Sequence, residues 1–169
     1  LRALLAWLVP RLVRFRPEGL ENIPAKGPFI IAANHIHALD PIMIAIIAPQ
    51  HVSFMAKEEV MHSRLLGWFV KHVGSFPVKR GKADVQAIRQ ALGVLAAGNV
   101  LGIFPEGTRS KTGEVQAAFS GTALLAGRAD VPIVPVALCG KYRFGSVFRV
   151  KVGKPMRIAS AIAGRPTSE

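Results

Sequence analysis

A histidine and an aspartate stand close together in a polar stretch between two apolar segments. His35 and Asp40 belong to the run Asn34-His35-Ile36-His37-Ala38-Leu39-Asp40-Pro41. An imidazole takes or gives a proton near neutral pH, and a carboxylate fixes its tautomer and stabilises its charged form. The pair is therefore a candidate for general acid–base catalysis. The alternatives are that Asp40 only caps a helix and that His35 is a buried histidine satisfied by the backbone.

The flanking segments place this pair in a turn from a strand into a helix. The apolar run Phe29 to Ala33 predicts a buried strand. Ile42 to Ala48 predicts a helix that Asp40 caps and Pro41 begins. On a continuous helix, groups five positions apart face different ways, so the two side chains meet only if His35 precedes the helix. In open α/β sheets, such turns at the carboxyl ends of strands hold ligands and reactive groups.

Two further polar clusters follow predicted strands. Residues 79–82 (Lys-Arg-Gly-Lys) come after a short strand near Phe76, and Glu106 to Arg109 come after the strand Val100 to Phe104. Because the ends of parallel strands share one edge of a sheet, we expect the three clusters to converge. Arginine binds phosphate through a planar fork of donors, so the convergence predicts proton transfer beside a bound anion. The alternatives are a solvated basic turn at 79–82 and a local ion pair between Glu106 and Arg109.

The order of predicted elements indicates an α/β fold in a single domain. Further strands are expected at 51–57, 132–138 and 147–153, and helices at 84–97 and 119–128, with one more strand possible at 13–16. This alternation predicts a mixed, mostly parallel sheet flanked by helices on both faces. Pro135 favours an edge or a bulge for its strand. Alternating apolar and basic residues in 147–153 suggest an antiparallel edge strand.

Composition points to a partner that is both apolar and anionic. Of the 169 residues 50% are hydrophobic, yet the net charge is +12. A membrane surface with acidic lipids fits this better than nucleic acid, because aromatic residues are only 7% and no basic stretch is interleaved with them. Residues 1–15 predict an amphipathic segment on the membrane surface, with packing onto its own domain as the alternative. Residues 16–169 form the predicted catalytic domain.

Other chemistries fit the sequence less well. No Gly-x-Ser-x-Gly motif is present, and Thr108 stands where a P-loop places lysine. The single cysteine, Cys139, lies among apolar residues and indicates a reducing compartment. His35 and His37, two positions apart on an extended segment, would point the same way and hold a metal. The later histidine ligands of a metal-dependent hydrolase are missing, since the last histidine is His72, so we expect no metal.

Without a nucleophilic side chain, the simplest role for the His35–Asp40 pair is that of a general base. It would act on a bound alcohol, which then attacks the electrophile directly. A positioned base contributes about 10²–10⁴-fold to the rate. An anion site beside it would hold the phosphate of the alcohol and bring the reactants together.

Four blocks together resemble the glycerophospholipid acyltransferases of the 1-acyl-glycerol-3-phosphate acyltransferase type. Asn34, His35 and Asp40 match the Asn-His-x4-Asp box, and Gly74 and Arg80 match the second block. Residues 104–110 match Phe-Pro-Glu-Gly-Thr-Arg-Ser, and residues 131–135 match the fourth block, Val-Pro-Ile-Val-Pro. The resemblance covers about residues 18 to 155.

The resemblance implies a role for each matched residue. His35 deprotonates the glycerol hydroxyl and Asp40 orients His35. The acceptor and its phosphate are bound by Asn34, Lys79, Arg80, Glu106, Gly107, Thr108 and Arg109. Three positions depart from the usual pattern, namely His37, which replaces a common serine, Pro77 and Ser120. His37 leaves the identity of the acceptor open.

The implied reaction transfers an acyl group from acyl-CoA or acyl-carrier protein to the free hydroxyl of lysophosphatidic acid, giving phosphatidic acid. No cofactor is implied. The expected location is the cytoplasmic face of the cell membrane, as a peripheral or monotopic protein. The alternatives are another acceptor, such as glycerol 3-phosphate, another lysophospholipid or a glycolipid, and a non-catalytic phospholipid-binding domain.

Overall fold

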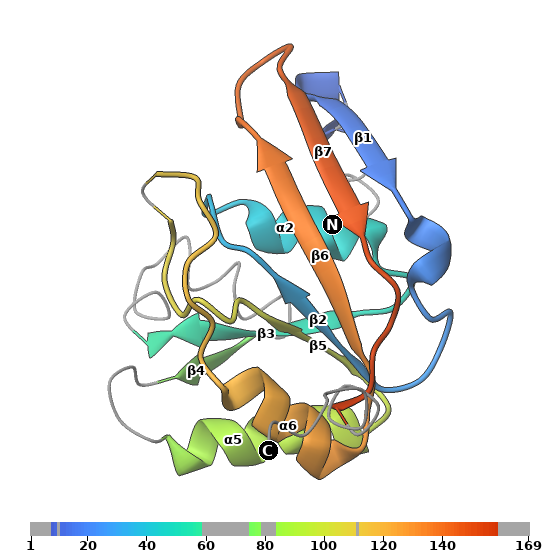
Figure 1. Cartoon of the computed structure of the whole chain (residues 1–169), viewed down its shortest axis with the longest axis vertical. Helices are drawn as coiled ribbons and strands as arrows, with labels where there is room; N and C mark the ends of the chain where they lie inside the picture. The colour runs from blue at the N-terminus through green and yellow to red at the C-terminus, as the bar shows by residue number, and fades with distance from the viewer. Residues whose placement is uncertain (1–7, 10, 59–74, 79–83, 111, 159–169) are drawn as a thin grey trace, which may run out of the picture.

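A single mixed sheet organises the chain (Figure 1). The computed structural model describes residues 8–9, 11–58, 75–78, 84–110 and 112–158. Within these ranges the strands are β1 (Arg14–Glu18), β2 (Phe29–Ala33), β3 (Val52–Lys57), β4 (Phe76–Val78), β5 (Val100–Ile103), β6 (Ile133–Gly140) and β7 (Val147–Val152). The helices are α2 (Asp40–Ile47), α5 (Val85–Ala96) and α6 (Gly121–Ala129), with a 3-10 turn at Leu20–Asn22. The strand order is β1-β7-β6-β2-β5-β3-β4.

The sheet is mostly parallel and is covered on both faces, as the sequence predicts. Only the pairing of β6 with β7 is antiparallel among the strand pairs of the described residues. In β2, Phe29 and Ile31 pack into the core that includes α2, whereas Ile30 packs into the core that includes α5 and α6. A strand buried on both faces is apolar throughout instead of alternating, which explains the run in β2. No described helix has the length and apolar character needed to cross a bilayer.

The expectation that residues 147–153 form an edge strand is wrong. β7 is antiparallel and alternates buried with exposed residues, but it is not an edge, because β1 pairs along its outer side. Arg14 and Phe15, the last residues of the predicted N-terminal segment, belong to this added strand. Since apolar alternation reports only burial of one face, it does not reveal a further strand beside it.

The sequence predicts an edge or a bulge for Pro135, and the edge is not observed, since β6 has β2 and β7 on its two sides. The partner chain is irregular opposite the proline, however. Val136 pairs with Val152, and Ile133 pairs with Met156. The two pairs are three residues apart in β6 but four residues apart in the segment that leaves β7. This one-residue bulge accommodates the missing N–H, and Gly153 N still donates to Pro135 O at 2.8 Å.

A glycine in β5 makes room for an aromatic stack that reaches the polar edge. A Cβ on Gly102 would lie 2.3 Å from a ring carbon of Phe54, its neighbour on β3. The Phe54 ring stacks on Phe104 with centroids 6.0 Å apart, and Phe104 in turn stacks on His35 at 4.1 Å. The absence of a side chain at Gly102 therefore sets the position of the rings beneath His35.

Gly102→Ala is expected to destabilise the fold by roughly 1–3 kcal/mol, because the new methyl overlaps the buried Phe54 ring. Gly93→Ala is the matched control. Gly93 is exposed in α5 with no atom within 4 Å of its added Cβ, so this change should stabilise the helix by about 0.5–1 kcal/mol. Urea denaturation measures both. An unchanged midpoint for Gly102→Ala would contradict the packing described.

Candidate active site

The carboxylate of Asp40 accepts hydrogen bonds from the turn that follows β2. Its Oδ2 accepts hydrogen bonds from His35 Nδ1 at 2.8 Å and from the backbone amides of Ile36 and His37, both at 2.7 Å. Its Oδ1 accepts from the Tyr142 hydroxyl at 2.6 Å. The side chain of Asp40 is fully buried. An ionised carboxylate only accepts, so His35 Nδ1 carries the hydrogen and the Nε2 lone pair is left as the basic site.

The expectation that Asp40 caps the helix is wrong. Asp40 is the first residue of α2, Leu39 occupies the N-cap position, and no side chain caps this end. The carboxylate points back to the amides of the preceding turn instead of forward to those of the helix. The alternative in which Asp40 is only a cap therefore fails, and the predicted His35–Asp40 contact is present.

The main chain of His35 is fixed by the segment that follows β5. Its N–H donates to Glu106 Oε1 at 3.2 Å, and its carbonyl accepts from Ser110 N at 2.7 Å. The ring lies on Phe104, and 14% of the side chain is exposed. Two of the three predicted clusters, 34–40 and 106–109, therefore converge. The third holds Lys79 and Arg80, which lie outside the described residues, so its position is not part of this geometry.

The residues after Phe104 form a tight turn beside His35. Gly107 has a φ of 67°, and its N–H donates to Phe104 O at 3.0 Å. Glu106 is 4% exposed, and its Oε2 has no hydrogen-bond partner among the described residues. Thr108 and Arg109 are exposed. No ion pair within 4.0 Å joins Glu106 and Arg109, so the structure lacks the local ion pair considered as the alternative.

Asn34 extends the contact between β2 and β6 with its side chain. Its Nδ2 donates to Leu138 O at 3.0 Å and its Oδ1 accepts from Leu138 N at 2.7 Å. The side-chain amide of Asn34 thus bonds through both its nitrogen and its oxygen to the backbone of a single residue, Leu138. The pair replaces the ladder bonds that β2 would have made had it continued past Ala33.

His37 does not point the same way as His35. Its ring stacks on Tyr142, which follows β6, with centroids 4.4 Å apart, and its Nδ1 accepts from Leu39 N at 3.2 Å. The His35 ring stacks on Phe104, which follows β5 on the other side of β2. The segment is a turn wrapped around a carboxylate and not an extended strand, and this separates the two imidazoles.

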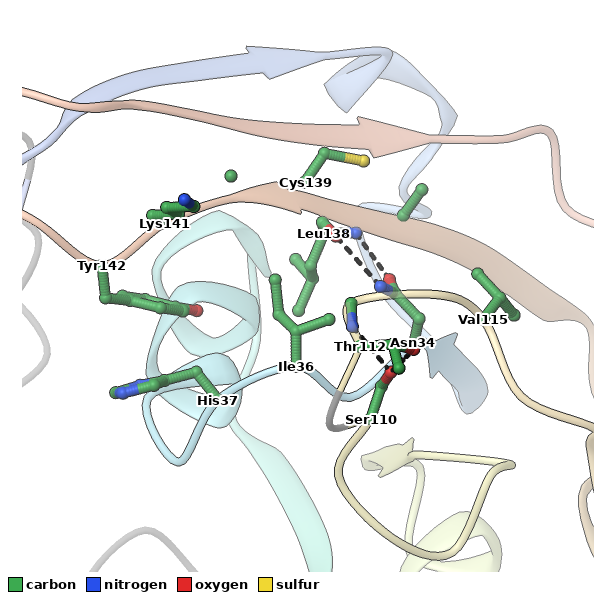
Figure 2. A pocket seen from close by; sticks show the side chains of 13 residues that line it. Asn34, Ile36, His37, Ser110, Thr112, Val115, Leu138, Cys139, Lys141 and Tyr142 are labelled. Carbon is green, nitrogen blue, oxygen red and sulfur yellow. Dashed lines mark hydrogen bonds between the residues drawn. The ribbon is translucent and has the colours of Figure 1, made fainter.

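A groove of about 540 Å³ lies beside this turn (Figure 2). Three segments line it, within residues 34–37, 110–115 and 137–142. The close-up shows the His37 and Tyr142 rings together on one side and the Asn34–Leu138 hydrogen bonds toward the other. Cys139 is exposed in its wall. The apolar part of this lining includes Ile36, Val115 and Leu138, which suits an amphipathic ligand.

Comparison with known proteins decides the family. The family model described as Acyltransferase matches residues 14–139. The chain belongs to this acyltransferase family. It is 32% identical over 155 residues to the 1-acyl-sn-glycerol-3-phosphate acyltransferase of Bacillus subtilis, a match that covers 88% of this chain and 76% of that protein. It is also 34% identical over 136 residues to the lyso-ornithine lipid O-acyltransferase of Pseudomonas aeruginosa, covering 78% of this chain and 52% of that protein.

The fold of this acyltransferase also matches a solved structure. The crystal structure of the 1-acyl-sn-glycerophosphate (LPA) acyltransferase PlsC from Thermotoga maritima superposes with a TM-score of 0.78 at 25% identity, over 99% of this chain and 71% of that one. Other related 1-acyl-sn-glycerol-3-phosphate acyltransferases are longer, and the chain spans between 35% and 55% of their length. Together the matches show that the chain is an O-acyltransferase, which sets aside the non-catalytic alternative.

Tyr142 was missed by the sequence reasoning although it touches the central carboxylate. A signal was present: Lys141, Tyr142 and Arg143 form a polar cluster after the strand predicted at 132–138, as the other clusters do after theirs. Because β6 is parallel to β2, its end lies at the same edge of the sheet. Burial raises the pKa of Tyr142 well above its usual value of about 10, and the charge and hydrogen bond of Asp40 raise it further.

This acyltransferase has one tyrosine, so its tyrosinate absorbance reports Tyr142 alone. We expect the folded protein to show no tyrosinate signal near pH 10, where a free tyrosine is half ionised. Because the folded pKa lies above the unfolded one, the stabilisation from this group is complete below about pH 10 and is lost as the pH rises further. Alkaline titration followed by absorbance and circular dichroism tests this. Ionisation at pH 10 without unfolding would contradict the buried contact.

Proposed function

We propose that this acyltransferase transfers a fatty acyl group from a thioester donor to the free hydroxyl of lysophosphatidic acid, giving phosphatidic acid. One observation carries the proposal: His35 Nδ1 is bonded to the buried carboxylate of Asp40 at 2.8 Å, which leaves Nε2 as a base at the carboxyl edge of the sheet. The Bacillus subtilis relative is a 1-acyl-sn-glycerol-3-phosphate acyltransferase, which supports the choice of acceptor.

The proposed chemistry is a direct transfer with His35 as general base. Nε2 takes the proton of the acceptor hydroxyl as its oxygen attacks the thioester carbonyl carbon. The tetrahedral intermediate then expels the thiolate, which takes the proton back from the His35 imidazolium. Asp40 stabilises that cation and holds the tautomer. Acyl-CoA and acyl-carrier protein present the same thioester, so either serves as donor, and the steps need no resident cofactor.

The proposed phosphate site uses the cations beside His35. Arg109 is exposed on the turn that begins at Phe104, and Thr108 precedes it. Lys79 and Arg80 remain proposed members of the same site. Glu106 suits a different partner, because its carboxylate repels phosphate and its Oε2, which has no partner among the described residues, would accept a hydrogen bond from a donor such as a ligand hydroxyl.

The other two predicted binding residues act through the backbone in this proposal. Gly107 allows the turn its positive φ, and a Cβ there would lie 2.9 Å from the Phe119 ring. Asn34 holds the end of β2 to β6 through Leu138 and so fixes where His35 begins the turn. Neither proposed role requires a side-chain contact with the acceptor.

His35→Ala should lower acyl transfer by at least about 10²-fold, since the general base is lost. The matched control is His51→Ala, at an exposed histidine before β3, which should retain full activity. The assay uses purified protein, labelled acyl-CoA or acyl-carrier protein, and a panel of lyso acceptors. Circular dichroism checks that both variants fold. Substantial turnover by folded His35→Ala would rule out His35 as the base.

A lyso-ornithine lipid is the second candidate acceptor, because a relative of similar identity is a lyso-ornithine lipid O-acyltransferase. Arg109→Ala separates the two possibilities. If the acceptor phosphate is bound there, KM for lysophosphatidic acid should rise roughly 10- to 100-fold with a smaller change in kcat, since charge-assisted hydrogen bonds are lost. Arg128→Ala, at an exposed arginine in α6, removes the same charge elsewhere and should leave KM unchanged. An unaltered KM for Arg109→Ala would argue against this phosphate site.

We also propose that one end of the protein docks peripherally on the cytoplasmic face of an anionic membrane. Leu8, Leu12 and Phe144 are 38%, 45% and 82% exposed, and Lys141 and Arg143 are exposed beside Phe144. A hydrogen bond from Gly145 N to Leu12 O joins the two segments. Exposed apolar side chains next to cations suit a surface of acidic lipid. Val9 and Val13 pack inward, so the described part of the predicted segment 1–15 has residues both in the core and at the surface, whereas residues 1–7 and 10 lie outside the described residues.

Replacing both Arg143 and Phe144 by serine should weaken binding to vesicles that contain an anionic lipid by roughly tenfold, because a large apolar side chain and a cation leave the contact. Val85→Ser is the control. Val85 is 65% exposed at the start of α5, at the end of the molecule opposite the β6–β7 connection (Figure 1). Co-sedimentation with neutral and anionic vesicles at two salt concentrations measures the effect. Equal loss in the control, or no loss in the double variant, would refute this docking surface.

A further inference from the structure

We propose that Tyr142 is a positioning residue for catalysis, which orients the Asp40 carboxylate and through it the basic nitrogen of His35. The inference rests on the proposed function, because it presumes that His35 acts as the base. The Tyr142 hydroxyl donates to Asp40 Oδ1 at 2.6 Å, whereas the other donors, from residues 35–37, all bind Oδ2.

The division of donors between the two oxygens is what gives Tyr142 this role. Three bonds to Oδ2 hold one corner of the carboxylate, and the bond to Oδ1 holds the other, so the plane of the group is fixed. That plane sets the direction of the 2.8 Å contact with His35 Nδ1 and hence where Nε2 points. Among the described residues, Tyr142 is the only donor to Oδ1. Without it, a fully buried carboxylate oxygen would have no partner, which is costly.

The tyrosine is itself held rigidly. Its ring stacks on His37 at 4.4 Å and lies tilted against Phe148 at 4.5 Å. Phe148 is fully buried in β7, so Tyr142 connects the Asp40 carboxylate to the sheet's core. Since burial and the charge of Asp40 raise the pKa of Tyr142, the phenol keeps its proton at neutral pH and remains a donor. A positioning group needs this fixed geometry, because small displacements of a base reduce the rate steeply.

Tyr142→Phe is the decisive variant, because it removes the hydroxyl and keeps the ring. We expect kcat to fall roughly tenfold, because losing part of the free energy of a hydrogen bond to a charged group raises the activation free energy by a corresponding amount. KM for acceptor and donor should be nearly unchanged. Nitrogen-15 NMR of His35 should show the Nδ1–H tautomer in the unaltered protein and a mixture of tautomers in the variant. A merely structural tyrosine would leave the tautomer unchanged.

Two further variants separate the hydroxyl from the ring. Tyr142→Leu also removes the contacts with His37 and Phe148, so it should lower stability more than Tyr142→Phe does. Val85→Ser, at an exposed residue at the start of α5 and outside the groove, should change neither kcat nor the tautomer. If Tyr142→Phe fails to fold, the tyrosinate titration of the unaltered protein and of Asp40→Asn replaces it. The proposal requires the Tyr142 pKa to fall when the charge of Asp40 is removed. An unchanged Tyr142 pKa in Asp40→Asn would overturn the proposal.

Wild-type kcat and an unchanged His35 tautomer in folded Tyr142→Phe would overturn the proposal, and so would a change in KM alone. The test distinguishes this failure from failure of the proposed function. If the unaltered protein transfers no acyl group to any acceptor, the proposed function fails. The NMR comparison still decides whether Tyr142 sets the state of His35.

Discussion

A buried carboxylate is stable only when hydrogen-bond donors replace the water that it has lost. At Asp40 those donors are a histidine ring, two successive backbone amides and a tyrosine hydroxyl. Satisfying this charge determines the local chain path: the turn closes on the carboxylate, helix α2 begins at Asp40, and His35 is left with one bonded nitrogen and one basic nitrogen. The requirement that stabilises the turn also positions the proposed base.

The sheet supplies the remaining constraints on His35. β2 lies between β5 and β6, so the turn that leaves it is bordered by the segments that leave those two strands. The first contributes the Phe104 ring, the Glu106 carboxylate and the Ser110 amide, and the second contributes Tyr142. A histidine held in this way loses little freedom when a ligand arrives, which is the condition for an effective general base.

The same edge of the sheet also brings the proposed membrane contact close to the proposed catalytic pair. Tyr142 and Phe144 belong to one short connection between β6 and β7, and the first faces the buried carboxylate while the second is almost wholly exposed. Phe144 of the proposed membrane contact is therefore two residues along the chain from Tyr142, which binds the carboxylate of the proposed catalytic pair. Lys141 and Arg143, the basic side chains beside and between them, place positive charge where the proposed anionic membrane surface would approach.

Local signals in the sequence were sufficient to predict the fold class and the contact between His35 and Asp40. The run Phe29 to Ala33 predicted a buried strand, and the alternation of elements predicted an α/β sheet with helices on both sides. The polar residues at the ends of the β2 and β5 strands had to meet once the strands were parallel. The contact between His35 and Asp40 was also predictable, since both lie in a single turn.

Tertiary structure decided what depends on distant partners. Tyr142 reaches Asp40 from 102 positions away, and no periodicity or spacing encodes that bond. Asp40 turned from the helix toward the preceding amides because those donors and Tyr142 together satisfy both of its oxygens. Pro135 was accepted inside the sheet because the chain opposite it carries an extra residue. The sequence by itself determined which residues could do the chemistry and at which edge they gather; only the packing of β5, β6 and β7 around β2 determined how each side chain points.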